Sequence, residues 1–152
     1  MDLVIGIGNS LRSDDGIGPH LVERLVGRDE MEAVAVQQLT LDLADRVRRA
    51  RRVLFVDADA IGEEIRLRRL SAKPGSGLGH SVHPAALLDW TQRTYGTSPE
   101  AWLLSVPGER FEIGEGLSWE AEQRLPAAVD AINGWLEQTR GPMTCSASEE
   151  ET

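Results

Sequence analysis

Short apolar runs alternate with stretches of helical spacing along the chain. The runs that predict strands are rich in β-branched residues and span Leu3–Ile7, Ala33–Leu39, Val53–Asp57, Ile65–Leu70 and Trp102–Val106. Apolar residues three or four positions apart predict helices over Asp15–Val26, Leu41–Ala50, Pro84–Tyr95 and Ser118–Thr139. This alternation favours an α/β fold, a three-layer αβα arrangement with a mostly parallel, roughly five-stranded twisted sheet and helices on both faces. Because the link between the third and fourth strands is short, these two are expected to run antiparallel.

Length and charge narrow the range of partners. The 152 residues predict one domain over 1–140, followed by a polar, acidic tail at 141–152 that is expected to be disordered. A net charge of −9 argues against nucleic acid as a partner, since phosphate binding requires a positive field. The chain has no apolar run of membrane-spanning length and no basic leader before a signal core, which predicts a cytoplasmic protein without a membrane partner. The single cysteine, Cys145, excludes an internal disulfide and a cysteine metal cage.

A glycine-rich turn joins the first strand to the first helix, and it carries two adjacent carboxylates. Turns of this kind often bind phosphate through backbone N–H groups, but Asp14 and Asp15 would repel an anion, so a cation is the expected ligand. Asp14 is well placed to cap the helix that follows, and we favour that role for it. Asp15 is then the better candidate for a metal ligand. Asn9 is expected to close the turn with a side-chain hydrogen bond.

Further acids follow the third predicted strand. In a parallel sheet, ligands bind beyond the carboxyl ends of the strands, so Asp57 and Asp59 are expected near Asp15 if their strands are neighbours. A carboxylate at the end of a buried strand needs a partner, and Asp57 can be either a hydrogen-bonded loop anchor or a metal ligand. Asp59 is expected to be solvated.

Two histidines lie just before the helix that is predicted to begin at Pro84. Carboxylate oxygens and one imidazole suit Zn, Ni, Co or Fe, and three protein ligands leave positions open for a substrate atom or water. His83 competes with His80 for this role, and a capping or surface role is the ordinary alternative for either. His20 is expected to be packed or half-exposed on the first helix. The basic run from Arg46 to Arg52 is expected to be the solvated face of a helix.

These motifs, in this order, resemble the hydrogenase maturation proteases, the endopeptidases that trim nickel–iron hydrogenase large subunits. The resembling segments are Gly6-Ile7-Gly8-Asn9, Asp14-Asp15-Gly16-Ile17-Gly18, Phe55-Val56-Asp57-Ala58 and Ser81-Val82-His83. The family's metal site consists of two carboxylates and a histidine, which the resemblance places at Asp15, Asp57 and His83. Many members have glutamate where this chain has Asp15, so a cation here would lie closer to the turn. Two further segments, Gln37–Ala44 and Val106–Ser118, are similar to the members that serve cytosolic NAD-linked bidirectional hydrogenases.

The resemblance implies an aspartic-type endopeptidase that cuts a C-terminal peptide from a nickel-loaded large-subunit precursor. Asp15, Asp57 and His83 would then be both the catalytic and the metal-binding residues, and Thr40 and Asn9 would contact the substrate. The nickel is supplied by the precursor, Cd or Zn can substitute for it in a crystal, and the protease is expected to be a monomer.

The chain lacks the motifs of other peptidase classes. It has no Ser-His-Asp set at plausible positions, no nucleophilic cysteine and no His-Glu-x-x-His motif. Two other functions are open: a non-catalytic metal-binding or metal-sensing module, and a nucleotide-binding domain that uses the glycine turn.

Overall fold

The computed structural model describes residues 1–25, 27–75, 82–138, 150 and 151. Its strands are β1 (Asp2–Ile7), β2 (Met31–Val36), β3 (Arg52–Asp59), β4 (Arg66–Leu70), β5 (Glu100–Pro107) and β6 (Glu150–Glu151). Its α-helices are α1 (Ile17–Glu23), α2 (Ala44–Arg48), α3 (Pro84–Tyr95) and α4 (Trp119–Glu137). Two short 3-10 helices, η1 (Ser13–Gly16) and η2 (Leu41–Leu43), lead into α1 and α2.

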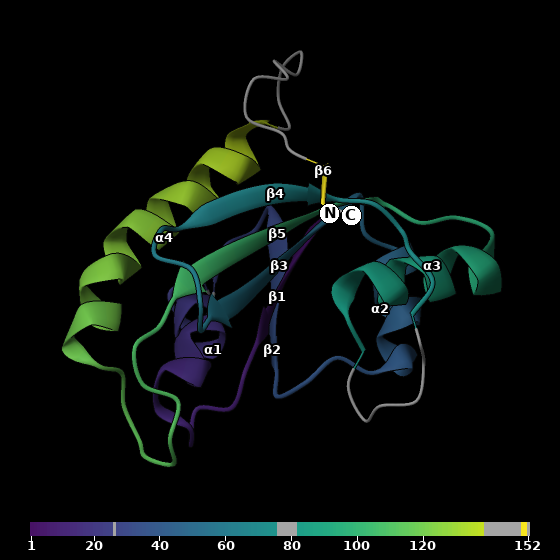
Figure 1. The fold of residues 1–152 in the computed structure, drawn as a ribbon. Helices are drawn as coiled ribbons and strands as arrows, with labels where there is room; N and C mark the ends of the chain where they lie inside the picture. Colours follow the sequence, from purple (N-terminus) through teal and green to yellow (C-terminus); the bar gives the residue numbers. More distant parts are fainter. Residues whose placement is uncertain (26, 76–81, 139–149, 152) are drawn as a thin grey trace.

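The strands form one sheet in the order β2-β1-β3-β5-β4-β6 (Figure 1). β1 pairs in parallel with β2 and β3, and β3 pairs in parallel with β5, so the carboxyl ends of these four strands share one edge of the sheet. β4 runs antiparallel to β5, which confirms the expected reversal between the third and fourth strands. The two do not pair with each other, because β5 lies between them.

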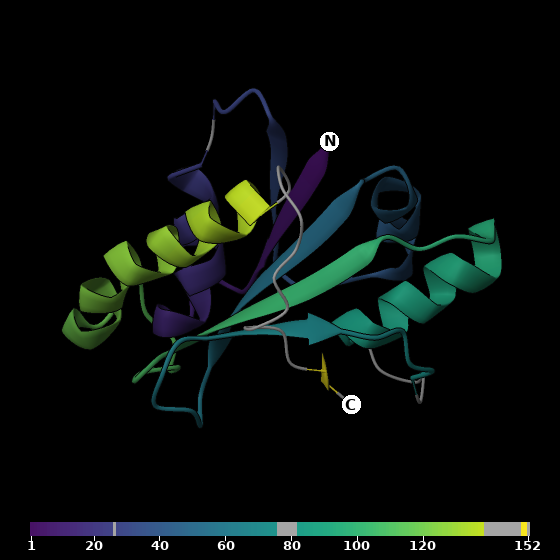
Figure 2. The same ribbon diagram turned by 90° about the horizontal axis from the view of Figure 1, so that it is seen from above.

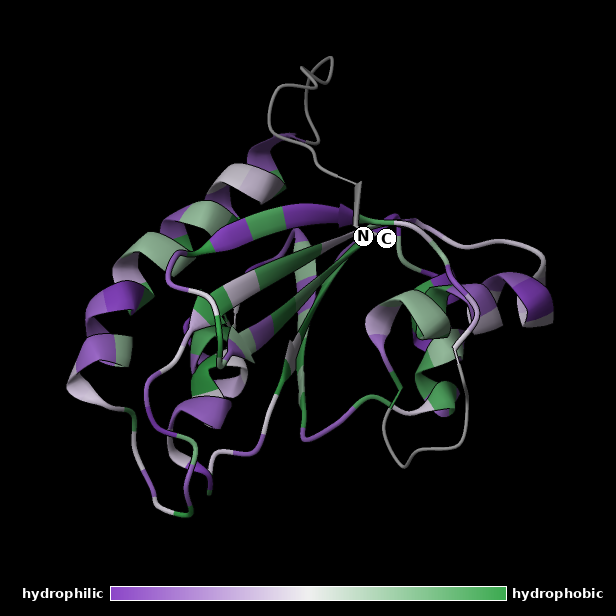
Figure 3. Cartoon of the chain, viewed as in Figure 1, coloured by the Kyte–Doolittle hydropathy of each residue, from purple (hydrophilic) through white to green (hydrophobic). Residues whose placement is uncertain are grey.

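Helices cover both faces of the sheet, as the alternation of elements predicts (Figures 1 and 2). Neighbouring strand residues point to opposite faces, so each strand supplies two cores. On one face Val4, Leu54 and Leu104 pack with α1 and α4, and on the other face Leu3 and Phe55 pack with α2 and α3. Figure 3 shows the strands that carry these side chains as largely hydrophobic, whereas the outer surfaces of the helices are mixed.

The ends of several elements differ from the sequence prediction. β2 ends at Val36 and not at Leu39, since the chain leaves the sheet at the two polar residues that follow. The first predicted helix begins as the 3-10 turn η1, and the second is divided between η2 and α2. α3 has the predicted bounds, and Ser118 caps α4 by accepting a hydrogen bond from the Ala121 N–H (3.1 Å).

The predicted acidic tail and the absence of a predicted membrane span can each be compared with the described residues. Of the tail at 141–152, only the two residues of β6 fall within the described part of the chain, so its disorder stays a prediction. No helix in the described ranges is long and apolar enough to cross a lipid bilayer.

The turn after β1 is positioned by close contact between β1 and α1. A Cβ atom on Gly6 would lie 2.5 Å from the Gly18 carbonyl oxygen, and one on Gly18 would lie 2.6 Å from the Ile7 carbonyl oxygen. Any larger side chain at either position would separate the helix from the strand. These glycines therefore fix the place of η1, and with it the place of the acidic residues.

Candidate functional site

Asp15 and Asp57 meet at the carboxyl edge of the parallel strands. Asp15 lies in η1, which ends the turn that follows β1, and Asp57 lies near the end of β3, which pairs with β1. Both side chains are half-buried, and both line a pocket of about 1090 Å³ between the sheet edge and α3. The expectation that two acids from neighbouring strands approach each other is therefore confirmed for this pair.

The two acids have different surroundings in the pocket. Burial raises the pKa of Asp57 to about 7; a hydrogen bond from the Ala58 N–H (2.8 Å) opposes the shift, and the charges of Asp15 and Asp59 add to it. The Asp15 carboxylate instead accepts a hydrogen bond from the Asn9 N–H at 2.7 Å. A cation between the two acids would relieve their repulsion, so the pocket favours positive charge at this end.

His83 also lines this pocket, as the N-cap of α3. Its Nδ1 atom accepts a hydrogen bond from the Ala85 N–H at 3.1 Å, so the capping role considered from the sequence is present. In the neutral ring, an accepting Nδ1 leaves the proton on Nε2. Binding of a metal ion by Nε2 would therefore require His83 to give up this cap or lose the Nε2 proton.

The three predicted ligands share a pocket without forming a closed cage. Asp15, Asp57 and His83 all line it. In the part of the chain that the structure describes, no three His, Cys, Asp or Glu side chains are grouped closely enough to hold a metal ion. Two carboxylates in one pocket suit a divalent cation. The three-residue metal site stays a prediction.

Asp14 is not the helix cap that its position suggests. Its side chain is fully buried, and α1 has no side-chain cap. The carboxylate accepts hydrogen bonds from the Glu109 N–H (2.7 Å), the Arg110 N–H (3.0 Å), and the N–H and hydroxyl of Ser118 (both 2.7 Å). Burial acts to raise the pKa of Asp14, but these hydrogen bonds outweigh it and hold the pKa below its usual value.

Asp14 thus ties the β5–α4 loop to the turn that carries Asp15. The sequence shows two adjacent acids but not their distant partners, so only the topology identifies this anchor.

The two predicted substrate-contacting residues lie in different settings. Thr40 lines the pocket, and its hydroxyl donates a hydrogen bond to the Asp42 carboxylate. Asn9 closes the turn, as expected, because its side-chain oxygen accepts a hydrogen bond from the Leu11 N–H (2.9 Å). Asn9 is not among the residues that line the pocket, although its N–H reaches Asp15.

The remaining candidates lie away from the pocket or outside the described ranges. Asp59 accepts a hydrogen bond from the Ile61 N–H (3.0 Å), and contacts with Gly62 and Ile61 lower its pKa. His20 is half-exposed on α1, as expected. His80 and Cys145 fall outside the described residues.

The glycine turn brings the chain after β1 into close contact with η1. Gly8 has a φ of 149°, and a Cβ atom there would lie 1.8 Å from the Asp15 carbonyl oxygen, so this position requires glycine. The two acids of the turn argue against the nucleotide-binding alternative, because carboxylates would repel a phosphate.

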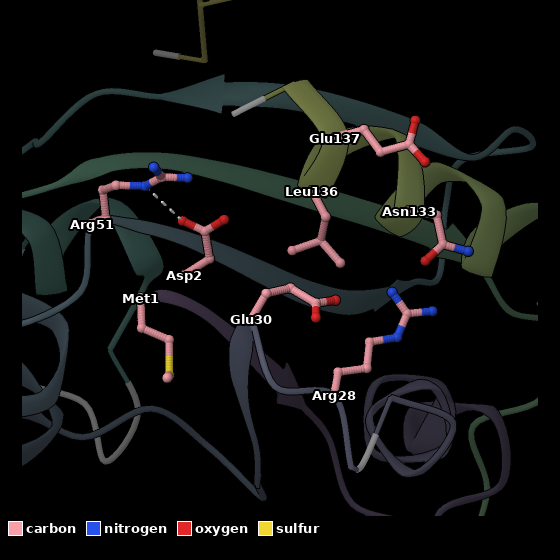
Figure 4. A pocket seen from close by; sticks show the side chains of 8 residues that line it. All are labelled: Met1, Asp2, Arg28, Glu30, Arg51, Asn133, Leu136 and Glu137. Carbon is pink, nitrogen blue, oxygen red and sulfur yellow. Dashed lines mark hydrogen bonds and ion pairs between the residues drawn. The ribbon is translucent and has the colours of Figure 1, made fainter. Parts of the chain in front are cut away.

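A second pocket, of about 440 Å³, lies at the amino ends of β1 and β2. Figure 4 shows its mostly charged lining, in which Arg51 donates to Asp2 at 3.4 Å. The neighbouring Arg52 is buried: it donates to Asp2 at 3.1 Å and lies over the Trp135 ring at 3.9 Å from its centre. The expectation that the whole basic run is solvated is thus wrong for Arg52, which belongs to β3. This pocket is at the opposite edge of the sheet from Asp15 and Asp57.

Comparison with solved structures finds the same fold in several proteases. The hydrogenase maturating endopeptidase HybD from E. coli is 20% identical, with a TM-score of 0.74 over 91% of this chain and 93% of that one. The [NiFe] hydrogenase maturation protease HycI from Thermococcus kodakarensis KOD1 is 20% identical, with a TM-score of 0.69 over 90% and 92%. The hydrogenase 2 maturation peptidase from Thaumarchaeota archaeon SCGC_AB-539-E09 is 27% identical, with a TM-score of 0.62 over 90% and 97%.

By sequence alone, the chain matches no protein-family model and no curated protein. The similarity to these solved structures covers about nine-tenths of the chain. The chain therefore has the fold of the hydrogenase maturation proteases, which confirms the resemblance predicted from its sequence.

Proposed function

We propose that this protein is an endopeptidase that removes a C-terminal peptide from the nickel-loaded precursor of a nickel–iron hydrogenase large subunit. The observation that carries the proposal is the coupled pair Asp15 and Asp57 in a large pocket, at the edge where parallel sheets bind their ligands. The shared fold supports the same activity. The two carboxylates in the glycine turn argue against nucleotide binding, because they would repel a phosphate.

Each residue of the proposed site has a role that follows from its surroundings. Asp15 and Asp57 supply oxygen ligands to the nickel of the precursor, and His83 supplies a nitrogen ligand once it leaves the Ala85 N–H. When bound, the ion polarises the scissile carbonyl or lowers the pKa of a water molecule. Asp57 takes the proton of the attacking water through a carboxylate oxygen. Thr40 and Asn9 position the substrate chain and the turn. The two aspartates carry the reaction without a protein nucleophile, so no acyl intermediate forms and the enzyme is of the aspartic type.

The proposal also covers the cellular context. The substrate is a hydrogenase precursor, the enzyme acts in the cytoplasm as a monomer, and it serves an NAD-linked bidirectional hydrogenase. Cd or Zn replaces nickel at the same ligands in a crystal.

The test is a processing assay with the purified protein and a nickel-loaded precursor, read by mass spectrometry of the large subunit. Wild type is expected to shorten the precursor, and Asp15→Asn and Asp57→Asn are expected to lower the rate at least ~100-fold, the order of effect seen when a general base is lost. Asp59→Asn is the matched control, because Asp59 lies at the end of the same strand but is bound into the loop that follows it.

Two outcomes would contradict the proposal. Unchanged processing by both site variants would exclude the two acids as the catalytic pair. A wild-type protein that binds the loaded precursor without cutting it would favour the metal-sensing alternative.

A further inference from the structure

The pocket that holds the two acids extends well beyond them, along the full length of α3. Four residues that line it share one face at helical spacing, namely His83, Ala86, Trp90 and Arg93, and Pro84 and Asp89 line it as well. At a rise of about 1.5 Å per residue, Trp90 lies about 10 Å along the helix axis from His83, and Arg93 about 15 Å. The pocket is therefore a groove that follows α3 from His83 at its start to Arg93 near its end.

The groove also has exposed apolar side chains. Trp90 is 43% exposed and Leu41 is 40% exposed, in a protein whose large apolar side chains are mostly buried. Leu41 belongs to η2, which packs against α3, and both side chains line the groove. Arg93, paired with Asp89 at 2.9 Å, lies beside them.

The distance along α3 matches a short extended peptide. An extended chain advances about 3.3 Å per residue, so the stretch of about 10 Å from His83 to Trp90 corresponds to three or four residues. Aromatic side chains on an accessible wall give large contact areas at low entropic cost and often dominate binding. The groove therefore combines the residues proposed for the cut with exposed apolar side chains that suit an anchor.

We propose that Trp90 and Leu41 form a specificity subsite for an apolar side chain of the substrate, three or four residues from the bond that is cut. The occupant is an extended segment of the large-subunit precursor, so this inference rests on the proposed function. The peptide backbone runs along α3, and its apolar side chain covers the exposed faces of Trp90 and Leu41.

Binding and cleavage are measured separately in the test, with a fluorescently labelled nickel-loaded precursor. Trp90→Ala is expected to weaken binding by fluorescence anisotropy about tenfold and to raise KM by a similar factor, with kcat changed less than about twofold. Trp90→Phe, which keeps an apolar ring, is expected to restore most of the affinity. Trp119→Ala is the matched control, because Trp119 is a more exposed tryptophan (72%) on α4 and does not line the groove.

The position of the anchor is tested by replacing precursor residues with Asp, one at a time, on both sides of the cut bond. A loss of affinity at position three or four on either side, present with wild type and absent with Trp90→Ala, supports the subsite. Equal affinities of wild type and Trp90→Ala, or a sensitive position elsewhere, would overturn it. If wild type binds the precursor with a loss of affinity at position three or four but does not cut it, the proposed function fails while the subsite stands. If wild type does not bind the precursor at all, the proposed function and the subsite both fail.

Discussion

Asp57 lowers the stability of the native protein at neutral pH, and its replacement by Asn should reveal by how much. The pKa of this group is about 7 in the folded protein against an ordinary value of 3.8. Between these two values the folded chain holds a proton that the unfolded chain has lost. Stability therefore falls as pH rises through this window, and the loss is complete above the folded pKa.

The magnitude follows from the shift. A difference of about three pKa units corresponds to about 4 kcal/mol above pH ~7, at about 1.4 kcal/mol per unit. Because Asp57 is only half-buried and water screens its charge, this value is a ceiling. Asp57→Asn removes the charge and keeps an oxygen that accepts the Ala58 N–H, so the variant should be more stable than wild type. The difference in the free energy of unfolding between Asp57→Asn and wild type should widen by about 2 kcal/mol between about pH 5.5 and about pH 8.5.

Urea unfolding, followed by the fluorescence of the buried Trp102 and Trp135, measures both proteins across this range. Asp59→Asn is the control with the opposite sign, since hydrogen bonds from Gly62 and Ile61 lower the pKa of Asp59 in the folded protein. A stability gap between Asp57→Asn and wild type that does not change with pH would refute the reasoning. So would a less stable Asp57→Asn protein at alkaline pH.

Three more substitutions test individual parts of the site. Asp14→Asn should lower the free energy of unfolding in urea by about 3 kcal/mol at neutral pH, because it removes a buried charge that accepts four hydrogen bonds. Since the pKa of Asp14 is lowered in the folded state, wild type should lose this extra stability as pH falls below about 4. The same stability difference between wild type and Asp14→Asn in acid would contradict this. His83→Ala should lower the free energy of unfolding by about 1 kcal/mol in the same assay, because α3 loses its cap, whereas His83→Asn should retain the cap. Both variants should stop processing of the precursor. An active His83→Asn enzyme would rule out the imidazole as a metal ligand. Gly8→Ala should displace Asp15 and abolish processing, because the new Cβ atom would lie 1.8 Å from the Asp15 carbonyl oxygen. Gly27→Ala is the control and should process the precursor normally, because a Cβ atom there would meet nothing within 4 Å. An active Gly8→Ala enzyme would show that the turn tolerates the shift.

The fold was predictable because its signals are local. β-Branched runs and helical spacing predict β1 to β5 and the four α-helices, and the capping signals at Pro84 and Ser118 place the starts of α3 and α4. The bounds that were wrong lie where tertiary contacts decide the conformation. β2, for example, ends at Val36 because the chain turns toward the pocket, and no breaker residue marks this point.

The site was predictable only in part, since its geometry depends on residues far apart in the chain. Strand order alone brings Asp15 near Asp57, and the alternation of elements predicts that order in outline. The anchor role of Asp14 depends on Ser118, which lies 104 residues away, and the burial of Arg52 depends on Trp135, which lies 83 residues away. Neither contact leaves a pattern in the sequence near Asp14 or Arg52.

The central claim is that Asp15, Asp57 and His83 together hold the nickel of the substrate. The most direct measurement is anomalous scattering from crystals of the protein soaked with Ni or Cd. We expect one ion bound by a carboxylate oxygen of each acid and by a nitrogen of His83, at about 2.0–2.4 Å, with the His83 ring released from the Ala85 N–H. An ion bound elsewhere, such as in the pocket beside Asp2, or the absence of any ion from the two acids, would contradict the claim.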